Sequence, residues 1–356
     1  MRVRVSTTLA FGLLALVVVS SATFTHARGE ATREIQRLAS GLSKAVRVWK
    51  FDYRSHGGQT RSAYVLLPSW YGPRNDPRIP LVISPHGRGR SAEDNLKLWG
   101  DLPAIGDFAV ISPSGHGRRL RAYSWGAPGQ ISDRARMPTI AHHYLPWLHI
   151  KRHSIFAVGG SMGGQETLLL LARYPHLLAG AVAFDSVANF ALQYENFSRI
   201  RCNQKCLRHW NGPIGAGLKR LARKEVGGTP ASNPAGYAAR SPLHFAHQIA
   251  FSGVPLELWW SVSDLVVPEQ ARGQSGALFS RIRRLNPSAP VEAFVGRWIH
   301  TAEDRANRSL PFALAQLGLL PASYNERSHQ LHYVAPAQSA LRVRLAARTH
   351  HMFGAE

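Results

Sequence analysis

The sequence is poor in cysteine, and this limits how its fold can be held together. Only two cysteines, Cys202 and Cys206, occur in 356 residues, which excludes a fold built on a framework of disulfides. With His209 they would offer at most three metal ligands and no second cluster, so we expect no metal site, and no cofactor motif is present. If the protein is exported, an even count favours a disulfide that closes the short loop between Cys202 and Cys206.

Acidic residues are also scarce. The chain has 21 of them against 43 lysines and arginines, a formal net charge of +22. Such an excess attracts anionic partners, for example cell-wall polymers, phospholipid surfaces or acidic substrates. The basic residues are scattered, and neither a groove-reading motif nor a basic–aromatic repeat is present, which argues against specific nucleic-acid binding. The simpler interpretation is a soluble, arginine-rich surface with weak affinity for anionic surfaces.

Long apolar runs are missing except at the N-terminus. Residues 9–22 form an apolar segment that follows two arginines and is short for a membrane span. Small residues end possible cleavage sites at Ala22 and Ala27. This pattern predicts a secretory signal peptide over residues 1–27 and a secreted or periplasmic mature chain without a transmembrane domain. The alternative is an anchor formed by an uncleaved N-terminal segment.

A turn of small residues with one serine stands out in the remaining sequence. The apolar run Ile155–Val158 leads into Gly159-Gly160-Ser161-Met162-Gly163-Gly164, and a segment of helical character follows. A strand, a G-x-S-x-G turn and a helix are typical of a nucleophile elbow, in which a strained turn points the serine hydroxyl away from the sheet. Gly159 and Gly163 fit because larger side chains would collide there. By itself the motif also fits an ordinary strand-to-helix turn.

The chain alternates between predicted strands and helices. We expect strands at 46–53, 61–68, 80–84, 108–113, 155–158, 179–184, 254–260 and 291–295, and helices from Ser91 and at 141–148, 165–174, 269–285 and 301–317. This predicts an α/β fold with a mostly parallel sheet, an antiparallel N-terminal hairpin and helices on both faces. Residues 28–318 would form one domain, in which 187–245 is a cap or lid insertion. Residues 319–356 would be a C-terminal extension of unclear structure.

Residues with catalytic chemistry follow several of these strands. Ser161, Asp264, His300 and the turn His86-Gly87-Arg88 all fall at carboxyl ends, where active sites of parallel sheets lie. The catalytic candidates follow one another in the chain as serine, acid and histidine, which is the order of the α/β-hydrolase superfamily, and roughly residues 45–318 resemble that superfamily. The segment before and after Asp264 is similar to the acid region of secreted esterases and prolyl-oligopeptidase-like proteins. One departure is that many members carry a glycine a few residues before the acid, where this chain has Ser261-Val262-Ser263.

The resemblance implies a role for each residue. Ser161 would be the nucleophile, His300 its general base and Asp264 the group that orients His300. The backbone N–H of Met162, with that of Gly87 or Arg88, would form the oxyanion hole.

Other assignments stay open. Asp185 also ends a predicted strand and competes with Asp264 for the role of the acid. His86, Trp125 and Trp298 are weaker candidates for the substrate pocket.

We therefore expect an exported serine hydrolase that cleaves carboxylic esters, small or polymeric, through an acyl-enzyme. One alternative is a serine peptidase of the prolyl-oligopeptidase type. Another is a non-catalytic binding protein on a hydrolase fold, although the sequence keeps all three residues of a catalytic triad.

Overall fold

The computed structural model describes most of the chain. The described residues are 32–34, 42–115, 124–200, 215–326, 331–332 and 344–346. The predicted signal peptide, both cysteines and His209 lie outside these ranges, so the predicted disulfide is not tested. Among the described helices, none has the length and apolar character needed to cross a membrane.

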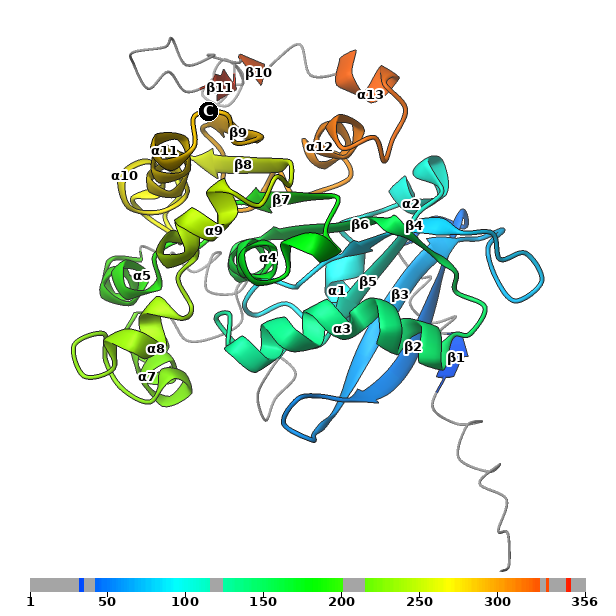
Figure 1. The fold of residues 1–356 in the computed structure, drawn as a ribbon, viewed down its shortest axis with the longest axis horizontal. Helices are drawn as coiled ribbons and strands as arrows, with labels where there is room; N and C mark the ends of the chain where they lie inside the picture. Colours follow the sequence, from blue (N-terminus) through cyan, green and yellow to red (C-terminus); the bar gives the residue numbers. More distant parts are fainter. Residues whose placement is uncertain are drawn as a thin grey trace, which may run out of the picture.

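A mixed sheet forms the centre of the molecule (Figure 1). Its strands are β1 (Thr32–Glu34), β2 (Val46–Arg54), β3 (Thr60–Pro68), β4 (Ile79–Ile83), β5 (Ala109–Pro113), β6 (Ile150–Gly160), β7 (Gly180–Phe184), β8 (Leu256–Ser261), β9 (Val291–Gly296), β10 (Leu331–His332) and β11 (Arg344–Ala346). They lie in the order β1-β2-β3-β5-β4-β6-β7-β8-β9-β11-β10. Strands β4 to β9 run parallel to their neighbours in this group, whereas β2 and β3 form the predicted antiparallel hairpin.

Helices cover both faces of the sheet, as predicted. The α-helices are α1 (Ala92–Leu96), α2 (Leu102–Gly106), α3 (Pro128–Tyr144), α4 (Met162–Arg173), α5 (Phe190–Asn196), α7 (Ala216–Val226), α8 (Pro234–Ala238), α9 (Ala246–Ala250), α10 (Gln270–Gly273), α11 (Ser275–Leu285), α12 (Leu310–Gln316) and α13 (Ser323–Glu326). Apolar residues of α3, α4, α9 and α11 pack on one face, and those of α1, α2 and α12 on the other. Strands β5, β7 and β8 are buried along their whole length because both faces are covered.

Three helices differ from the sequence prediction. The predicted helix at 141–148 is the end of the longer α3, which begins at Pro128 and stops before Pro146. The predicted helix at 269–285 is broken into α10 and α11 at Gln274, whose backbone is not helical. The predicted helix at 301–317 is helical only over α12, which has Pro311 in its first turn, where proline is tolerated.

The predicted insertion at 187–245 contributes a third apolar cluster. Its helices α5, α7 and α8 lie together at one end of the molecule (Figure 1). Residues of these helices pack with Trp125, Met162 and Val267. Met162 directly follows Ser161, so the insertion packs beside the predicted nucleophile. Its role as a lid stays a prediction.

Candidate active site

Ser161 occupies a tight turn between β6 and α4. Its backbone has φ 59° and ψ −124°, a conformation that costs a residue with a side chain about 1–3 kcal/mol. A Cβ atom at Gly159 would lie 2.6 Å from the carbonyl of Gly163, and one at Gly163 would lie 2.2 Å from Pro85 O. Larger side chains therefore cannot occupy these two positions without a backbone shift. This agrees with the expectation from the sequence that larger side chains would collide at Gly159 and Gly163.

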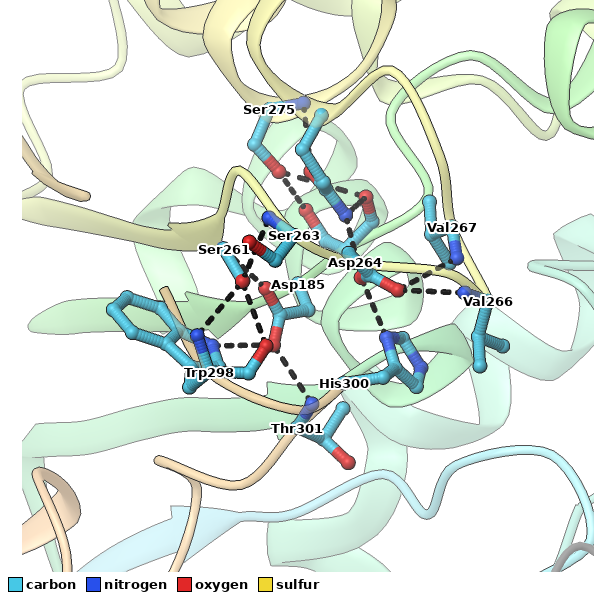
Figure 2. Close-up of polar contacts among 12 residues, drawn as sticks. Asp185, Ser261, Ser263, Asp264, Val266, Val267, Ser275, Trp298, His300 and Thr301 are labelled. Carbon is cyan, nitrogen blue, oxygen red and sulfur yellow. Dashed lines mark hydrogen bonds and ion pairs between the residues drawn. The ribbon is translucent and has the colours of Figure 1, made fainter. Parts of the chain in front are cut away.

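His300 and Asp264 form a buried pair. His300 Nδ1 lies 2.6 Å from Asp264 Oδ2 (Figure 2), and both side chains are about 1% exposed. The other carboxylate oxygen of Asp264 accepts backbone bonds from Val266 and Val267 at 2.8 and 2.9 Å, which fixes the direction of the carboxylate. Burial alone would lower the pKa of His300, but the charge and hydrogen bond of Asp264 outweigh burial, so this pKa is raised.

The loop after β9 that carries His300 and Thr301 (the histidine loop) lies directly against the turn between β6 and α4 that carries Ser161 (the serine turn). A Cβ atom at Gly160 would be 3.1 Å from Thr301 Cγ2 and 2.4 Å from Asp304 Oδ2. Ser161 and His300, which these two segments carry, are both buried. The structure thus brings His300 and Asp264 into contact and places the loop that carries His300 against the turn that carries Ser161, at the carboxyl edge of the sheet.

The rival acid, Asp185, lies in the same cluster but makes different contacts. Its side chain is fully buried and accepts hydrogen bonds from Ser261 N, Trp298 Nε1 and Thr301 N (Figure 2). Burial, together with the negative charge of Asp264, raises the pKa of Asp185 to about 7. The imidazole Nδ1 of His300 contacts Asp264, so the geometry favours Asp264 over Asp185 as the acid that orients His300.

The turn after β4 lies beside the serine. A Cβ atom at Gly87 would be 3.8 Å from Ser161 Cβ and 3.6 Å from Gly160 O. The neighbouring Arg88 is buried. This position places Gly87 close to the nucleophile, and the preceding Pro85 lies against Gly163 in the first turn of α4. The role of Gly87, Arg88 and Met162 as oxyanion donors stays a prediction.

The three weaker pocket candidates have separate environments. His86 is fully buried, and burial lowers its pKa to about 4. Its Nδ1 lies 3.0 Å from Gly87 O, so the neutral ring donates to that carbonyl and supports the turn. Trp125 is 2% exposed and packs on Phe190 of the insertion. Trp298 is half-buried and binds Asp185 through its indole nitrogen.

Sequence reasoning missed several charged residues around the site. Asp304, in the segment predicted as a helix, is buried next to the serine turn, and its pKa is raised by burial against the opposing charge of Arg90. On the far side of the turn, Arg134 and Glu166 form a fully buried ion pair at 3.0 Å. A glutamate inside the otherwise apolar helix α4 was the available signal for this pair, because a buried carboxylate needs a partner.

One group of three buried ligand-type side chains occurs in the described part of the chain. The ligand atoms of Asp185, Asp264 and His300 lie within 4.8 Å of one another. All four carboxylate oxygens already accept hydrogen bonds from backbone, indole or imidazole N–H groups. These donors would face a cation at close range, so the trio is built as a hydrogen-bonded network and does not fit a metal ion.

In comparisons with known proteins, this chain has matches among solved structures only. No protein-family model matches it, and no curated protein matches it. Among solved structures, similarity is found to a puromycin-hydrolyzing peptidase of Mycobacterium tuberculosis, with 18% identity and a TM-score of 0.54 over 78% of this chain and 40% of that one. Prolyl oligopeptidase B from Galerina marginata has 13% identity and a TM-score of 0.53, over 79% of this chain and 37% of that one.

A smaller protein is similar over its whole length. The fluorophosphonate-binding serine hydrolase FphF of Staphylococcus aureus has 16% identity and a TM-score of 0.53, over 76% of this chain and 98% of that one. This chain spans well under half of the two peptidases and nearly all of FphF. The sheet order, the helical layers and these similarities agree: the chain has the α/β-hydrolase fold.

Proposed function

We propose that this protein is a serine hydrolase that cleaves carboxylic esters through an acyl-enzyme. The observation that carries the proposal is the buried 2.6 Å contact between His300 and Asp264 beside a serine in a strained turn. A serine hydroxyl is a weak nucleophile until a neighbouring base removes its proton. The fold alone does not imply catalysis, because hydrolase folds also serve other functions.

In the proposed mechanism, Ser161 Oγ attacks the ester carbonyl and its proton passes to Nε2 of His300. Asp264 holds the ring with Nδ1–H toward the carboxylate and stabilises the imidazolium that forms. The backbone N–H of Met162 and that of Gly87 or Arg88 donate to the oxyanion, and each such donor is worth about a hundredfold in rate or more. The imidazolium then protonates the leaving alcohol. Water repeats the sequence on the acyl-enzyme and releases the acid.

Peptide hydrolysis is the second candidate. It is favoured by the peptidases among the similar structures. Esters and amides share the first step on the serine, so the elbow does not discriminate between them. Esters are our first choice, and FphF, the similar structure that this chain spans almost fully, is named a serine hydrolase and not a peptidase.

The place of action is part of the proposal. The N-terminal segment with two arginines and a short apolar run supports export. The full chain has a formal charge of +22, and residues 1–27 hold only Arg2 and Arg4 of its lysines and arginines, so the exported enzyme would stay strongly basic. It would be drawn to anionic surfaces or wall polymers. Salt should weaken that attraction, because exposed charges are screened.

A nitrophenyl ester series, from acetyl to long acyl chains, tests the proposal. We expect the purified protein to hydrolyse at least one member, and expect Ser161→Ala and His300→Ala to lose nearly all turnover while both remain folded. The control is a peptide anilide series, which the peptidase candidate predicts to be cleaved faster than the esters. Equal turnover by the wild type and Ser161→Ala would contradict the proposal.

A further inference from the structure

Three separate loops must be held in register for a triad of this kind. They follow β6, β8 and β9 and carry Ser161, Asp264 and His300. Asp185 follows β7, the strand that lies between β6 and β8 in the sheet. It is therefore placed at the centre of the site, although it is not needed for the proposed chemistry.

The carboxyl group of Asp185 joins two of these loops. Oδ2 accepts from Trp298 Nε1 at 2.8 Å and from Thr301 N at 2.7 Å, so it holds both sides of His300. Oδ1 accepts from Ser261 N at 2.7 Å, at the end of β8 and three residues before Asp264. Figure 2 shows the carboxyl group between these partners.

Ser261 strengthens the same junction. Its hydroxyl donates to Trp298 O at 2.7 Å and accepts from Trp298 N at 2.9 Å. The histidine loop is thus fixed to the end of β8 by one hydroxyl and one carboxyl group. The Ser261 and Asp185 side chains are fully buried and the Trp298 contacts are partly buried. A buried polar group that loses its hydrogen bond is left without water.

The backbone at Asp185 also reaches the loop that carries Ser161. The preceding Phe184 O accepts from Ser161 N at 2.8 Å. Asp185 N donates to Trp259 O at 2.7 Å. Asp185 and Thr301 both have positive φ, 44° and 55°, and such strained residues persist only where surrounding contacts hold them.

We propose that Asp185 is a positioning residue, which holds the His300 loop in register with Ser161 and Asp264 through its three N–H contacts. It acts through His300 and does not touch the reacting atoms. The inference rests on the proposed function, because it concerns the register of the same three residues. A displacement of about 1 Å in such a site can cost roughly a hundredfold in rate.

An electrostatic consequence follows from the same placement. The charged groups that face His300 are Asp264, Asp185 and Asp304, and all three favour the imidazolium. Arg90 and Arg305 face Asp304 and reduce its effect. Removing the carboxylate of Asp185 should therefore lower the pKa of His300.

Asp185→Asn is the variant that tests the proposal. The amide keeps one acceptor but turns an N–H group toward a donor, so we expect kcat to fall by about tenfold to a hundredfold. KM should change by less than about threefold, because substrate contacts are untouched. Trp298→Phe, which removes one of the three donors, should lower kcat by a smaller factor.

Asp133→Asn is the matched control. Asp133 is equally buried and accepts from the backbone and ring of His56 at 2.9 and 2.7 Å, but it lies in α3 away from the three loops. It should lose stability with kcat within about twofold of the wild type. A fall in kcat as large as that of Asp185→Asn would show that loss of any buried carboxylate is sufficient, and would overturn the proposal.

An NMR titration of His300 separates the inference from the proposed function, because it needs no turnover. In Asp185→Asn we expect the imidazole to titrate at lower pH than in the wild type, and the acidic limb of kcat/KM to move the same way. In Asp133→Asn both should be unchanged. An unshifted His300 titration in folded Asp185→Asn would overturn the inference, even if the esterase is confirmed. Conversely, a shift without esterase activity would support Asp185 and count against the esterase.

Discussion

Gly163 offers a sharp test of how the serine turn is assembled. It lies in the first turn of α4, and a Cβ atom there would stand 2.2 Å from Pro85 O and 3.0 Å from Pro85 C. The atoms in the way belong to the backbone just after β4, a strand buried inside the sheet. They cannot rotate aside as a side chain would. Gly163→Ala must therefore push the Pro85 turn away from the serine.

Two opposing effects decide the size of the loss. Alanine is better than glycine inside a helix by about 1 kcal/mol. Overpacking a rigid contact costs about 1–3 kcal/mol, and a 2.2 Å approach to backbone belongs at the upper end. We expect a net loss of about 1–2 kcal/mol in the free energy of unfolding. Because Gly87 moves with Pro85, its donor should leave the oxyanion position, with a loss of about a hundredfold in kcat.

Urea unfolding and nitrophenyl ester turnover measure these two losses. Gly72→Ala is the control, because a Cβ atom there meets nothing within 4 Å. The free energy of unfolding of Gly72→Ala should stay within about 0.5 kcal/mol of the wild-type value, and the variant should keep full activity. If Gly163→Ala matched the wild type in stability and turnover, the proposed contact between the two turns would be wrong.

The other predictions concern buried titratable side chains. Asp264→Asn should lower kcat by about ten-thousandfold; a smaller loss than that of Asp185→Asn would make Asp185 the acid. His86 has a pKa lowered to about 4 by burial, so its share of stability is lost as pH falls from about 6.5 to about 4, where only the unfolded chain takes up the proton. Urea unfolding of His86→Asn should show about 3 kcal/mol less loss over that range; an unchanged pH dependence would refute this. Arg134→Met leaves the buried Glu166 carboxylate without its ion-pair partner and should lower the free energy of unfolding by about 3–5 kcal/mol in the same assay. A loss under about 1 kcal/mol, typical of an exposed pair, would contradict this.

Strands β2 to β9 could be predicted because their signal is local, whereas β1, β10 and β11 were not predicted. Each strand from β4 to β9 contains a short, mainly apolar run followed by a turn, and burial on both faces requires that composition. In β6 this run follows an exposed polar start at residues 151–153, which the sequence prediction left out. The helices were harder to predict. The buried face of α3 includes Gln130, Asp133 and Arg134, which are polar in sequence and are accommodated by partners distant along the chain.

The segment 301–309 was mispredicted for a similar reason. Thr301 N is held by Asp185 and Ala306 N by Leu98 O at 2.7 Å, so distant contacts replace the helical bonds that the composition favoured. Asp304 was missed with it, because an acidic residue near a predicted helix start is expected to be solvated. Positions at strand ends were predictable from sequence, but the pairing of buried charges depends on tertiary contacts.

Labelling with a fluorophosphonate, followed by intact mass and peptide mapping, tests the central claim most directly. It asks whether Ser161 is a nucleophile activated by His300, and it does not depend on knowing the substrate. We predict one adduct per chain on the peptide that contains Ser161, no adduct in Ser161→Ala, and much slower labelling in His300→Ala. An adduct that forms at the same rate in Ser161→Ala, or no adduct in the folded wild type, would contradict the account.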